Sequence, residues 1–564
     1  MNYIKSSNYY NPAIFVWLLT ITAMVLLIIV IGGLTRLTDS GLSMTDWRPI
    51  LGIIPPIGFE KWMIVFEMYK QTPEYKIVNK NMSLDEFKYI FWWEWFHRIF
   101  ARAIGVVFII PLIYFSLKKQ IQSSLYIRLG VVFIFGLFQA FVGWWMVKSG
   151  LSENPYVSPY RLTFHLLNAL IIFSILLWIA MDYRYSSNIN FMSKPFMASF
   201  TFSYGALILV LLLWSVAITG SAIYLESYWH AHEIIYGVWG LGMFGFVATA
   251  APNWTGGKSL PSHFTMNAII LWVANRSSFA YIIDDHQIYF SIFLSLSWWL
   301  YTSCIIAKLV IVPRHARGMV ILALYIFIAL QDLTFLGLKA SGYETEASIL
   351  IKATVLFYTS LIGIVFSKIY PFFCSRALSS YRQIDMRNIN LFCSVASVIG
   401  ATLYMLSAFY QPIIAPGWIM IIVGITNCRR LYLWADRGIS KNAMLFFPFL
   451  AMLNIAWGLI LLGLANIFYA HYFTDILHFI AIAGILLMFS TIMLRVYLGH
   501  TGKKVIANRW VKCSFLLFLF AGLLRSVFSL TSYDPRYLIL SILLLIAATL
   551  IIQFQFIRIS TQRT

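Results

Sequence analysis

Long apolar stretches separated by short polar breaks run along almost the whole chain. A helix that spans a bilayer needs about 20 mostly apolar residues. Stretches of that kind predict about sixteen spanning helices, at residues 13–35, 98–118, 126–148, 161–182, 197–220, 230–251, 264–282, 288–310, 318–337, 348–367, 389–408, 413–428, 444–466, 472–495, 513–530 and 537–556. The pattern therefore predicts an all-α, polytopic membrane protein.

Composition and charge agree with this interpretation. Of the 564 residues, 60% are hydrophobic and only 11% are charged, which excludes an ordinary soluble domain. The net charge of +20 would suggest nucleic acid binding in a soluble chain. Here the Lys and Arg residues gather in alternate loops such as 429–441 and 503–512, whereas the intervening loops at 284–285 and 344–346 are acidic. Basic loops stay in the cytoplasm, so we expect both termini there and no nucleic acid partner.

The predicted outer loop at 36–97 is the exception in length. Its first part, GLSMTDWRPILGIIPPIG, is rich in Pro, Gly and Trp, and such residues are typical of ordered turns. We expect this loop to form an ordered cap over the outer face of the membrane.

Ionisable residues at the mouths of two predicted spans form the first candidate site. The stretch Trp92–Gly105, WWEWFHRIFARAIG, carries Glu94 and His97 three residues apart, which places them on one helix face. His165 lies about one turn inside the fourth span, which also starts on the outer side. Charged groups in a bilayer are costly and are functional by default. Two histidines at one depth can ligate a single haem iron from both sides.

Three arginines lie at the level of these histidines: Arg98, Arg102 and Arg161. Guanidinium groups form charge-assisted hydrogen bonds with carboxylates, so these side chains are candidates for holding the propionates of a haem. The plainer alternatives are core histidines without a metal, a Glu94 that only pairs with Arg98, and arginines that reach the lipid headgroups.

A second group of histidines lies in the later part of the chain. His230 and His232 stand at the outer start of one predicted span, and His478 lies near the outer start of another. Imidazoles at one depth suit a haem or copper site. His500 follows His478 by 22 residues on the same helix, or about 33 Å at 1.5 Å per residue, so as a ligand it would belong to a separate site. The alternative for all four is hydrogen bonding at the membrane interface.

Residues 14 to about 183 resemble the N-terminal half of the haem A synthase family. The matching stretches are GGLTRLTDSGLSMTDWRPILGIIPP, YKQTPEY, EWFHRIFARAIG, GWWMVKSGL and VSPYRLTFHLLNAL. The resemblance implies oxidation of a methyl group of haem O to the formyl group of haem A, for cytochrome oxidase assembly, at the outer side of a bacterial inner membrane. It also implies that His97 and His165 ligate the haem and that Glu94 is the catalytic carboxylate.

The second half of that family's fold has no counterpart after residue 183. Either the four-helix half binds one haem by itself, or two chains pair as a homo-oligomer. We expect a four-helix, haem-binding domain at 1–183, a linker at 184–196 and a twelve-helix domain at 197–564. The partners implied are an unidentified electron donor, and haem O synthase or cytochrome oxidase assembly factors.

From about residue 195 the chain resembles the NnrS family of membrane proteins associated with nitric oxide metabolism. The residues that carry this are SYWHAHEIIYGVWGLGMFGFVATAAPNWTG, KIYPFF and LHFIAIAGILLMFSTIMLRVYLGHTG. The resemblance implies haem and copper as cofactors. The haem at the first site would be haem O or haem A. The alternative is haem b.

Three hypotheses therefore stand side by side. The leading one is a haem A synthase-like oxidoreductase fused to an NnrS-like haem and copper domain. The alternative is a haem- and copper-binding protein of the nitric oxide response, without synthase activity. The third is a transporter or structural fusion in which both sets of histidines are relics.

Overall fold

The computed structural model describes residues 11–38, 40–45, 53–151, 155–185, 194–218, 228–279, 285–311, 316–382, 384–527 and 535–561. Every regular element in these ranges is a helix, and they contain no strand. Each of the sixteen predicted spans overlaps a helix, and eleven helices are long and apolar enough to cross a membrane. The all-α membrane fold is thus confirmed, whereas the count of sixteen spans stays a prediction.

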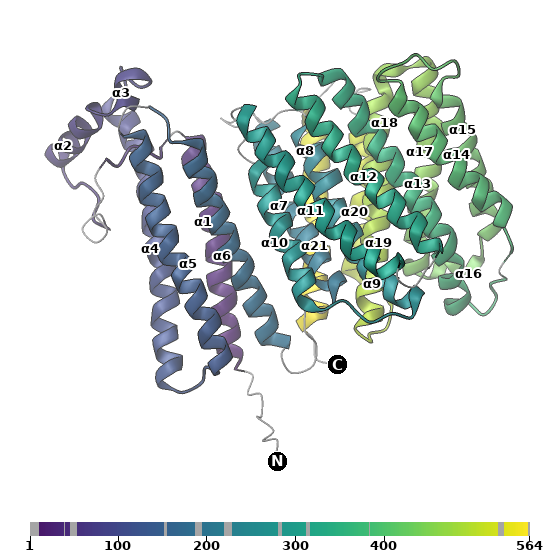
Figure 1. The fold of residues 1–564 in the computed structure, drawn as a ribbon, viewed down its shortest axis with the longest axis horizontal. Coiled ribbons are helices and arrows are strands. Elements are labelled where there is room, and N and C mark those ends of the chain that lie inside the picture. The colour runs from purple at the N-terminus through teal and green to yellow at the C-terminus, as the bar shows by residue number, and fades with distance from the viewer. Residues whose placement is uncertain are drawn as a thin grey trace. The chain divides into compact units, whose positions relative to one another are not determined.

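The chain divides into two compact units, residues 1–193 with 269–294, and residues 194–268 with 295–564. The first unit contains a bundle of four long helices (Figure 1). These are α1 (Pro12–Leu37), α4 (Leu84–Leu117), α5 (Ser123–Gly150) and α6 (Pro159–Tyr185). α1 packs against α4 and α6, and α6 packs against α5. Trp17, Leu18, Ile21, Leu129 and Leu176 lie in the buried core between them.

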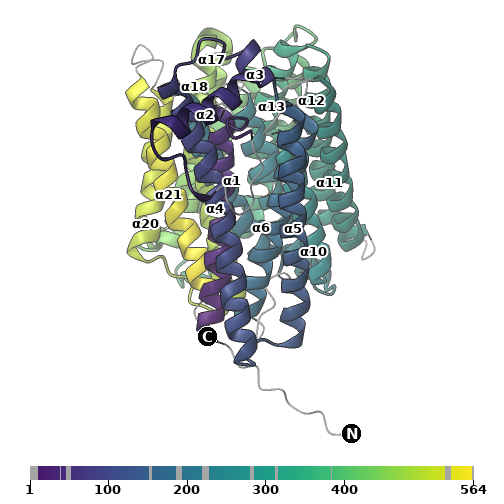
Figure 2. The ribbon, with the colours of Figure 1, turned by 90° about the vertical axis from the view of Figure 1, so that its left-hand side faces the viewer.

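Two short helices, α2 (Phe59–Lys70) and α3 (Pro73–Ile77), lie at one end of α4 (Figure 2). α4 begins at Leu84, well before the predicted 98, because Ser83 and Glu86 form a capping box: each side chain bonds the backbone N–H of the other. The added turns of α4 are buried against α2 through an aromatic cluster of Trp62, Phe66, Tyr69, Phe87 and Phe91. The predicted outer loop is therefore largely helical where it is described.

A buried tyrosine ties α2 to α3 within this cap. The Tyr69 hydroxyl donates to Glu74 Oε2 at 2.9 Å and accepts from Asn79 Nδ2 at 2.9 Å. Burial and the Glu74 carboxylate raise the pKa of Tyr69, so the hydroxyl keeps its proton and the bond. The segment at 69–79 is thereby fixed as an ordered structure, as the loop composition predicts.

The second unit holds the remaining helices, with α10 and α11 divided between the two units. They are α7 (Pro195–Ile218), α8 (Trp229–His232), α9 (Trp239–Thr255), α10 (Ser262–Phe279), α11 (Asp285–Ile311), α12 (Ala316–Ala340), α13 (Glu344–Ala377), α14 (Arg387–Leu406), α15 (Pro416–Trp434), α16 (Arg437–Lys441), α17 (Ala443–Phe468), α18 (Phe473–Phe479), α19 (Leu487–His500), α20 (Arg509–Ser526) and α21 (Pro535–Thr561). Residues 186–193, most of the predicted linker, lie outside the described ranges.

Two π-helical segments interrupt the helices of this unit where it is described. Glu233–Val238 joins α8 to α9, and Ile480–Leu486 joins α18 to α19. The first segment begins directly after His232, and the second begins two residues after His478. The helix that continues from each segment ends beside a glycine with positive φ, which is Gly256 for the first and Gly502 for the second. His232 precedes Gly256 by as many residues as His478 precedes Gly502. Because π-segments concentrate at functional sites, this repeated arrangement marks the helix ends that carry His232 and His478 as candidate functional sites.

Candidate haem and metal sites

His97 and His165 each lie against a glycine of a neighbouring helix. His97 on α4 faces Gly32 of α1, where an added Cβ would stand 3.3 Å from its Nε2. His165 on α6 faces Gly143 of α5, where an added Cβ would stand only 2.9 Å from its Cε1. The two glycines therefore leave the space that the imidazoles occupy.

The bundle brings the two imidazoles together, since a charge on His97 acts on His165. His165 Nε2 lies 3.3 Å from the Gln139 amide nitrogen, and the Gln139 oxygen accepts from Asn168 at 2.7 Å. His165 Nδ1 is buried and has no hydrogen-bond partner among the described residues. A buried nitrogen without a partner is costly in a protein interior, so this imidazole fits a site that a ligand completes.

Glu94 is buried, with 4% of its surface exposed, and its carboxylate is fully engaged. Its Oε2 accepts from Ser43 Oγ and from the Met44 backbone N–H, both at 2.7 Å. Its Oε1 pairs with Arg98, which also donates to the Met44 carbonyl at 3.0 Å. The carboxylate therefore fastens the chain after α1 to α4, one turn before His97. The catalytic role of Glu94 stays a prediction.

The other two arginines occupy different surroundings. Arg161 donates to the Trp145 carbonyl at 2.9 Å and stands 4.5 Å from the centre of the Trp145 ring. Arg102 is half-buried on α4, one turn after Arg98. Both cations belong to the bundle of His97 and His165, and their contact with propionates stays a prediction.

His232 is buried between two carboxylates in the second unit. Its Nε2 lies 2.8 Å from Asp332 Oδ1, and its Nδ1 lies 3.1 Å from Glu233 Oε1. The Asp332 Oδ2 atom also accepts from the Trp299 indole at 2.7 Å and from Ser295. Both ring nitrogens of His232 are therefore occupied by protein groups in this arrangement. The predicted role of His232 as a ligand would require one of these bonds to open.

His230 and His478 are better placed than His232 to act as a pair of metal ligands. Their ring centroids lie 6.3 Å apart and their planes differ by 17°. His478 Nδ1 lies 2.7 Å from the Thr474 carbonyl, which holds the proton on Nδ1 and leaves the lone pair on Nε2. Two metal–nitrogen bonds of about 2 Å, extended to the ring centres, give a separation of about 6 Å. The separation of the ring centres is therefore compatible with one metal ion bound by a nitrogen of each ring.

Charged side chains surround this histidine pair. Arg525 on α20 pairs with Asp475, which lies one turn before His478. Lys352 on α13 also acts electrostatically on His478. The sequence analysis missed Arg525, Lys352 and Asp332, although a charged residue within an apolar span is itself a signal of function.

His500 lies at the far end of α19 from His478. Its ring centre is 5.3 Å from that of Phe196, and its carbonyl accepts from Lys194 at 3.0 Å. Within the described residues, no group of three or more His, Cys, Asp or Glu side chains is arranged to hold a metal ion. The structure therefore brings His230 and His478 together and leaves His500 apart, as its spacing along the helix predicts.

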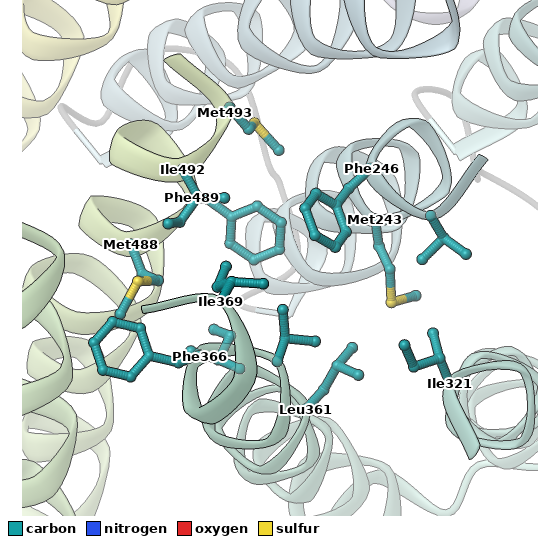
Figure 3. A pocket seen from close by; sticks show the side chains of 13 residues that line it. Met243, Phe246, Ile321, Leu361, Phe366, Ile369, Met488, Phe489, Ile492 and Met493 are labelled. Carbon is teal, nitrogen blue, oxygen red and sulfur yellow. The ribbon is translucent and has the colours of Figure 1, made fainter. Parts of the chain in front are cut away.

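An apolar cavity of about 80 Å³ lies between α9, α12, α13 and α19 (Figure 3). Met243 and Phe246 of α9 line it opposite Met488 and Phe489 of α19, and the lining holds no polar side chain. α9 and α19 continue the helices that carry His230 and His478. The cavity suits a small uncharged molecule that dissolves in lipid.

Two protein-family models match the chain. The model described as cytochrome oxidase assembly protein covers residues 15–330, and the model of the NnrS protein covers residues 190–563. The chain belongs to both families. The resemblances predicted from the motifs are thereby confirmed, and the first match extends well beyond the predicted boundary at residue 183.

Curated relatives match the cytochrome oxidase assembly part. A haem A synthase of Nitrosomonas eutropha is 52% identical over 165 residues, which are 29% of this chain and 46% of the relative. One of Paramagnetospirillum magneticum is 53% identical over 167 residues, 30% of this chain and 47% of the relative. One of Parvibaculum lavamentivorans is 46% identical over 182 residues, 32% of this chain and 53% of the relative. The chain spans about half the length of these relatives. No solved structure matches it.

Proposed function

We propose that the first unit oxidises haem O in the formation of haem A, as a haem A synthase-type enzyme in a bacterial inner membrane. The observation that carries the proposal is the pairing of His97 and His165 inside one bundle, each packed on a glycine. Similarity to haem A synthases over this part of the chain supports the same activity.

The residues of the bundle fit a haem in their chemistry. His97 and His165 would hold the iron, and His165 offers a buried nitrogen that has no partner among the described residues. Arg98, Arg102 and Arg161 would face the propionates. The bound haem supplies the redox chemistry, as cofactors do.

Glu94 contributes a fixed negative charge to this site. Because Arg98, Ser43 and Met44 hold the carboxylate in place, its charge is preorganised one turn from His97. A preorganised charge stabilises positive charge that develops on a substrate during oxidation. Conversion of a methyl group to a formyl group removes four electrons, so the reaction requires an oxidant. An electron donor is needed where that oxidant is dioxygen, and assembly factors of cytochrome oxidase would take the product.

The proposal is tested in a bacterial strain that lacks its own haem A synthase. The full chain should restore haem A, measured by extraction and chromatography of the membrane haems. His97→Ala and His165→Ala should abolish it, whereas His263→Ala, at an exposed histidine, should leave it unchanged. Haem A levels that are equal for all these variants, or absent with the native chain, contradict the proposal.

The second unit supports a second candidate function, a haem-binding role in the nitric oxide response. The observation that favours it is the pair of rings of His230 and His478 at 6.3 Å. Two imidazoles suit an iron that a porphyrin already holds by four nitrogens. A copper ion bound by protein alone usually takes three ligands or more, and the described residues offer no such group. We therefore assign haem to this pair and leave copper as the weaker part of the hypothesis.

A further inference from the structure

The chain that leads into α2 contains seven consecutive residues without a polar side chain, IIPPIGF at 53–59. Ile54 is 70% exposed, Ile57 67% and Phe59 69%, whereas Trp62 and Phe66 of α2 are buried in the aromatic cluster of the cap. The described parts of the chain therefore leave these three large side chains mostly uncovered. Apolar side chains grouped on a surface in this way mark a contact with a partner or with a membrane.

One hydrogen bond fixes the position of this segment along α4. Trp95 Nε1 donates to the Ile53 carbonyl at 3.2 Å. Leu117 ends α4 and follows Trp95 by 22 residues, or about 33 Å at 1.5 Å per residue, and Lys118 and Lys119 come next. The hydrocarbon core of a bilayer is about 30 Å thick. When the two lysines stand at one boundary of that core, Trp95 and the Ile53 carbonyl stand at the other.

The segment also lies beside the face of α4 that meets lipid. Trp92, Phe96, Val106 and Ile110 are all exposed and share this face, because their spacings of 4, 10 and 4 residues are close to whole numbers of helical turns. Trp95 is about 60° from Trp92 around the helix axis. The rings of Trp92 and Trp95 lie 5.2 Å apart, and tryptophans are typical of the membrane boundary. The exposed segment therefore adjoins the lipid-facing surface of α4.

The backbone of the segment suits an apolar environment. Backbone N–H groups that lack a partner are costly in lipid. Proline has no N–H, so Pro55 and Pro56 remove two such donors from the middle of the segment. Gly58, with a φ of 87°, then turns the chain into α2. The turn leaves the exposed side chains in a short stretch that both α2 and Trp95 hold in place.

We propose that residues 53–59 enter the interfacial layer of the bilayer beside α4, in the leaflet where α4 enters the membrane, with Ile54, Ile57 and Phe59 in contact with acyl chains. The segment would then anchor the cap of α2 and α3 to the membrane surface. A protein partner is the other kind of occupant for an apolar surface, but the position set by Trp95 places this one at the level of lipid. The proposal uses no residue of either histidine pair, so it does not depend on the haem functions proposed above.

The test uses the native full chain in phosphatidylcholine nanodiscs that contain a phosphatidylcholine with a diazirine near the ester end of one acyl chain. After illumination and digestion, lipid adducts are located by mass spectrometry. We expect adducts on 53–59 at a level at least tenfold above that on Ile77 and Val78. Those two residues are also exposed, but they lie at α3, which both views place beyond α2 at this end of the bundle (Figures 1 and 2). Exposed residues of α4 at 106–113 are the positive control.

Adducts on 53–59 that do not exceed those on Ile77 and Val78, while 106–113 is labelled, overturn the proposal. A second measurement uses the double variant Ile54→Asp, Ile57→Asp, which should lower the adducts on 53–59 at least fivefold and leave those on 106–113 unchanged. Ile77→Asp is the matched control and should change neither. Equal adducts in the double variant and the native chain would show that these side chains do not reach the acyl chains. Cross-linking of 53–59 to a second copy in place of lipid would also overturn the proposal.

Discussion

Individual histidines of this chain differ in what their ring nitrogens meet. Within the described parts of the chain, His165 keeps a buried nitrogen without a hydrogen-bond partner, whereas His232 has a carboxylate at each nitrogen. His478 is intermediate, since its Nδ1 is hydrogen-bonded to a backbone carbonyl and its Nε2 is not. A ligand-binding imidazole needs one free nitrogen and a second one that is oriented. By this criterion His165 and His478 are better placed for a metal than His232.

Gly143→Ala should impair haem binding at the first pair. The added methyl would stand 2.9 Å from His165 Cε1, so the imidazole has to move, and overpacking of this kind typically costs about 1–3 kcal/mol. We expect the haem content of the purified full chain to fall by at least half, measured by its absorption spectrum. Gly136→Ala on the same helix meets nothing within 4 Å and is the control. Equal haem content in both variants would show that the glycine makes no room for a ligand.

Only part of this residue-level arrangement could be predicted from the sequence. The pairing of Glu94 with Arg98 follows from their spacing of one helical turn. The bonds from Ser43 and Met44 do not, because they depend on how the chain folds back after α1. Asp332 meets His232 across 100 positions of sequence, and no local pattern encodes that contact.

Helices in the second unit approach closely where glycines face one another. A Cβ on Gly417 of α15 would lie 2.4 Å from the Gly463 carbonyl of α17, and the reverse distance is also 2.4 Å. Two turns further along α15, a Cβ on Gly424 would lie 2.6 Å from the Ala456 carbonyl. Small residues allow such backbone contact between membrane helices. α15 and α17 therefore form a tightly joined pair.

Gly463→Ala should destabilise the second unit. The methyl meets backbone, which cannot move aside as a flexible side chain can, so we expect a cost of about 1–3 kcal/mol and a melting temperature lower by several degrees. Gly363→Ala is the matched control, since its methyl would lie 3.9 Å from the Met452 side chain. A melting temperature that both substitutions leave unchanged would show that the α15–α17 contact is loose.

The elements themselves were largely predictable, because apolar stretches of membrane length leave few alternatives to a helix. The early start of α4 was missed although Ser83 and Glu86 form a recognisable capping box. The π-helical segments could not be predicted. Glu233–Val238 and Ile480–Leu486 read EIIYGV and IAIAGIL, which are ordinary apolar sequences.

The whole chain joins two families, and a pair of histidines proposed as ligands lies in each unit. His97 and His165 lie in the first unit, and His230 and His478 lie in the second. The two family matches overlap between residues 190 and 330, so the boundaries at 183 and 197 stay predictions. The positive-inside pattern of the loops and the predicted cytoplasmic termini also stay predictions.

Two independent haem populations are expected in the full chain. His97→Ala should remove one component of the visible absorption spectrum and His478→Ala the other, because the pairs have no ligand in common. The double variant should lose the sum of the two, since effects at separate sites add. Loss of all pigment in His478→Ala alone, in protein that remains folded by circular dichroism, would contradict two separate sites and the second candidate function together.

The π-helical segment Ile480–Leu486 has a consequence for how this protein can evolve. An α-helix turns by about 100° per residue, and a π-turn contains one residue more than an α-turn. Deleting a single codon there would convert the π-turn into an α-turn and leave His478 turned as before relative to α19. The same deletion in the α-helical part of α19 would rotate the two ends by about that angle relative to each other. This stretch should therefore tolerate the loss of one residue better than the α-helical turns beside it.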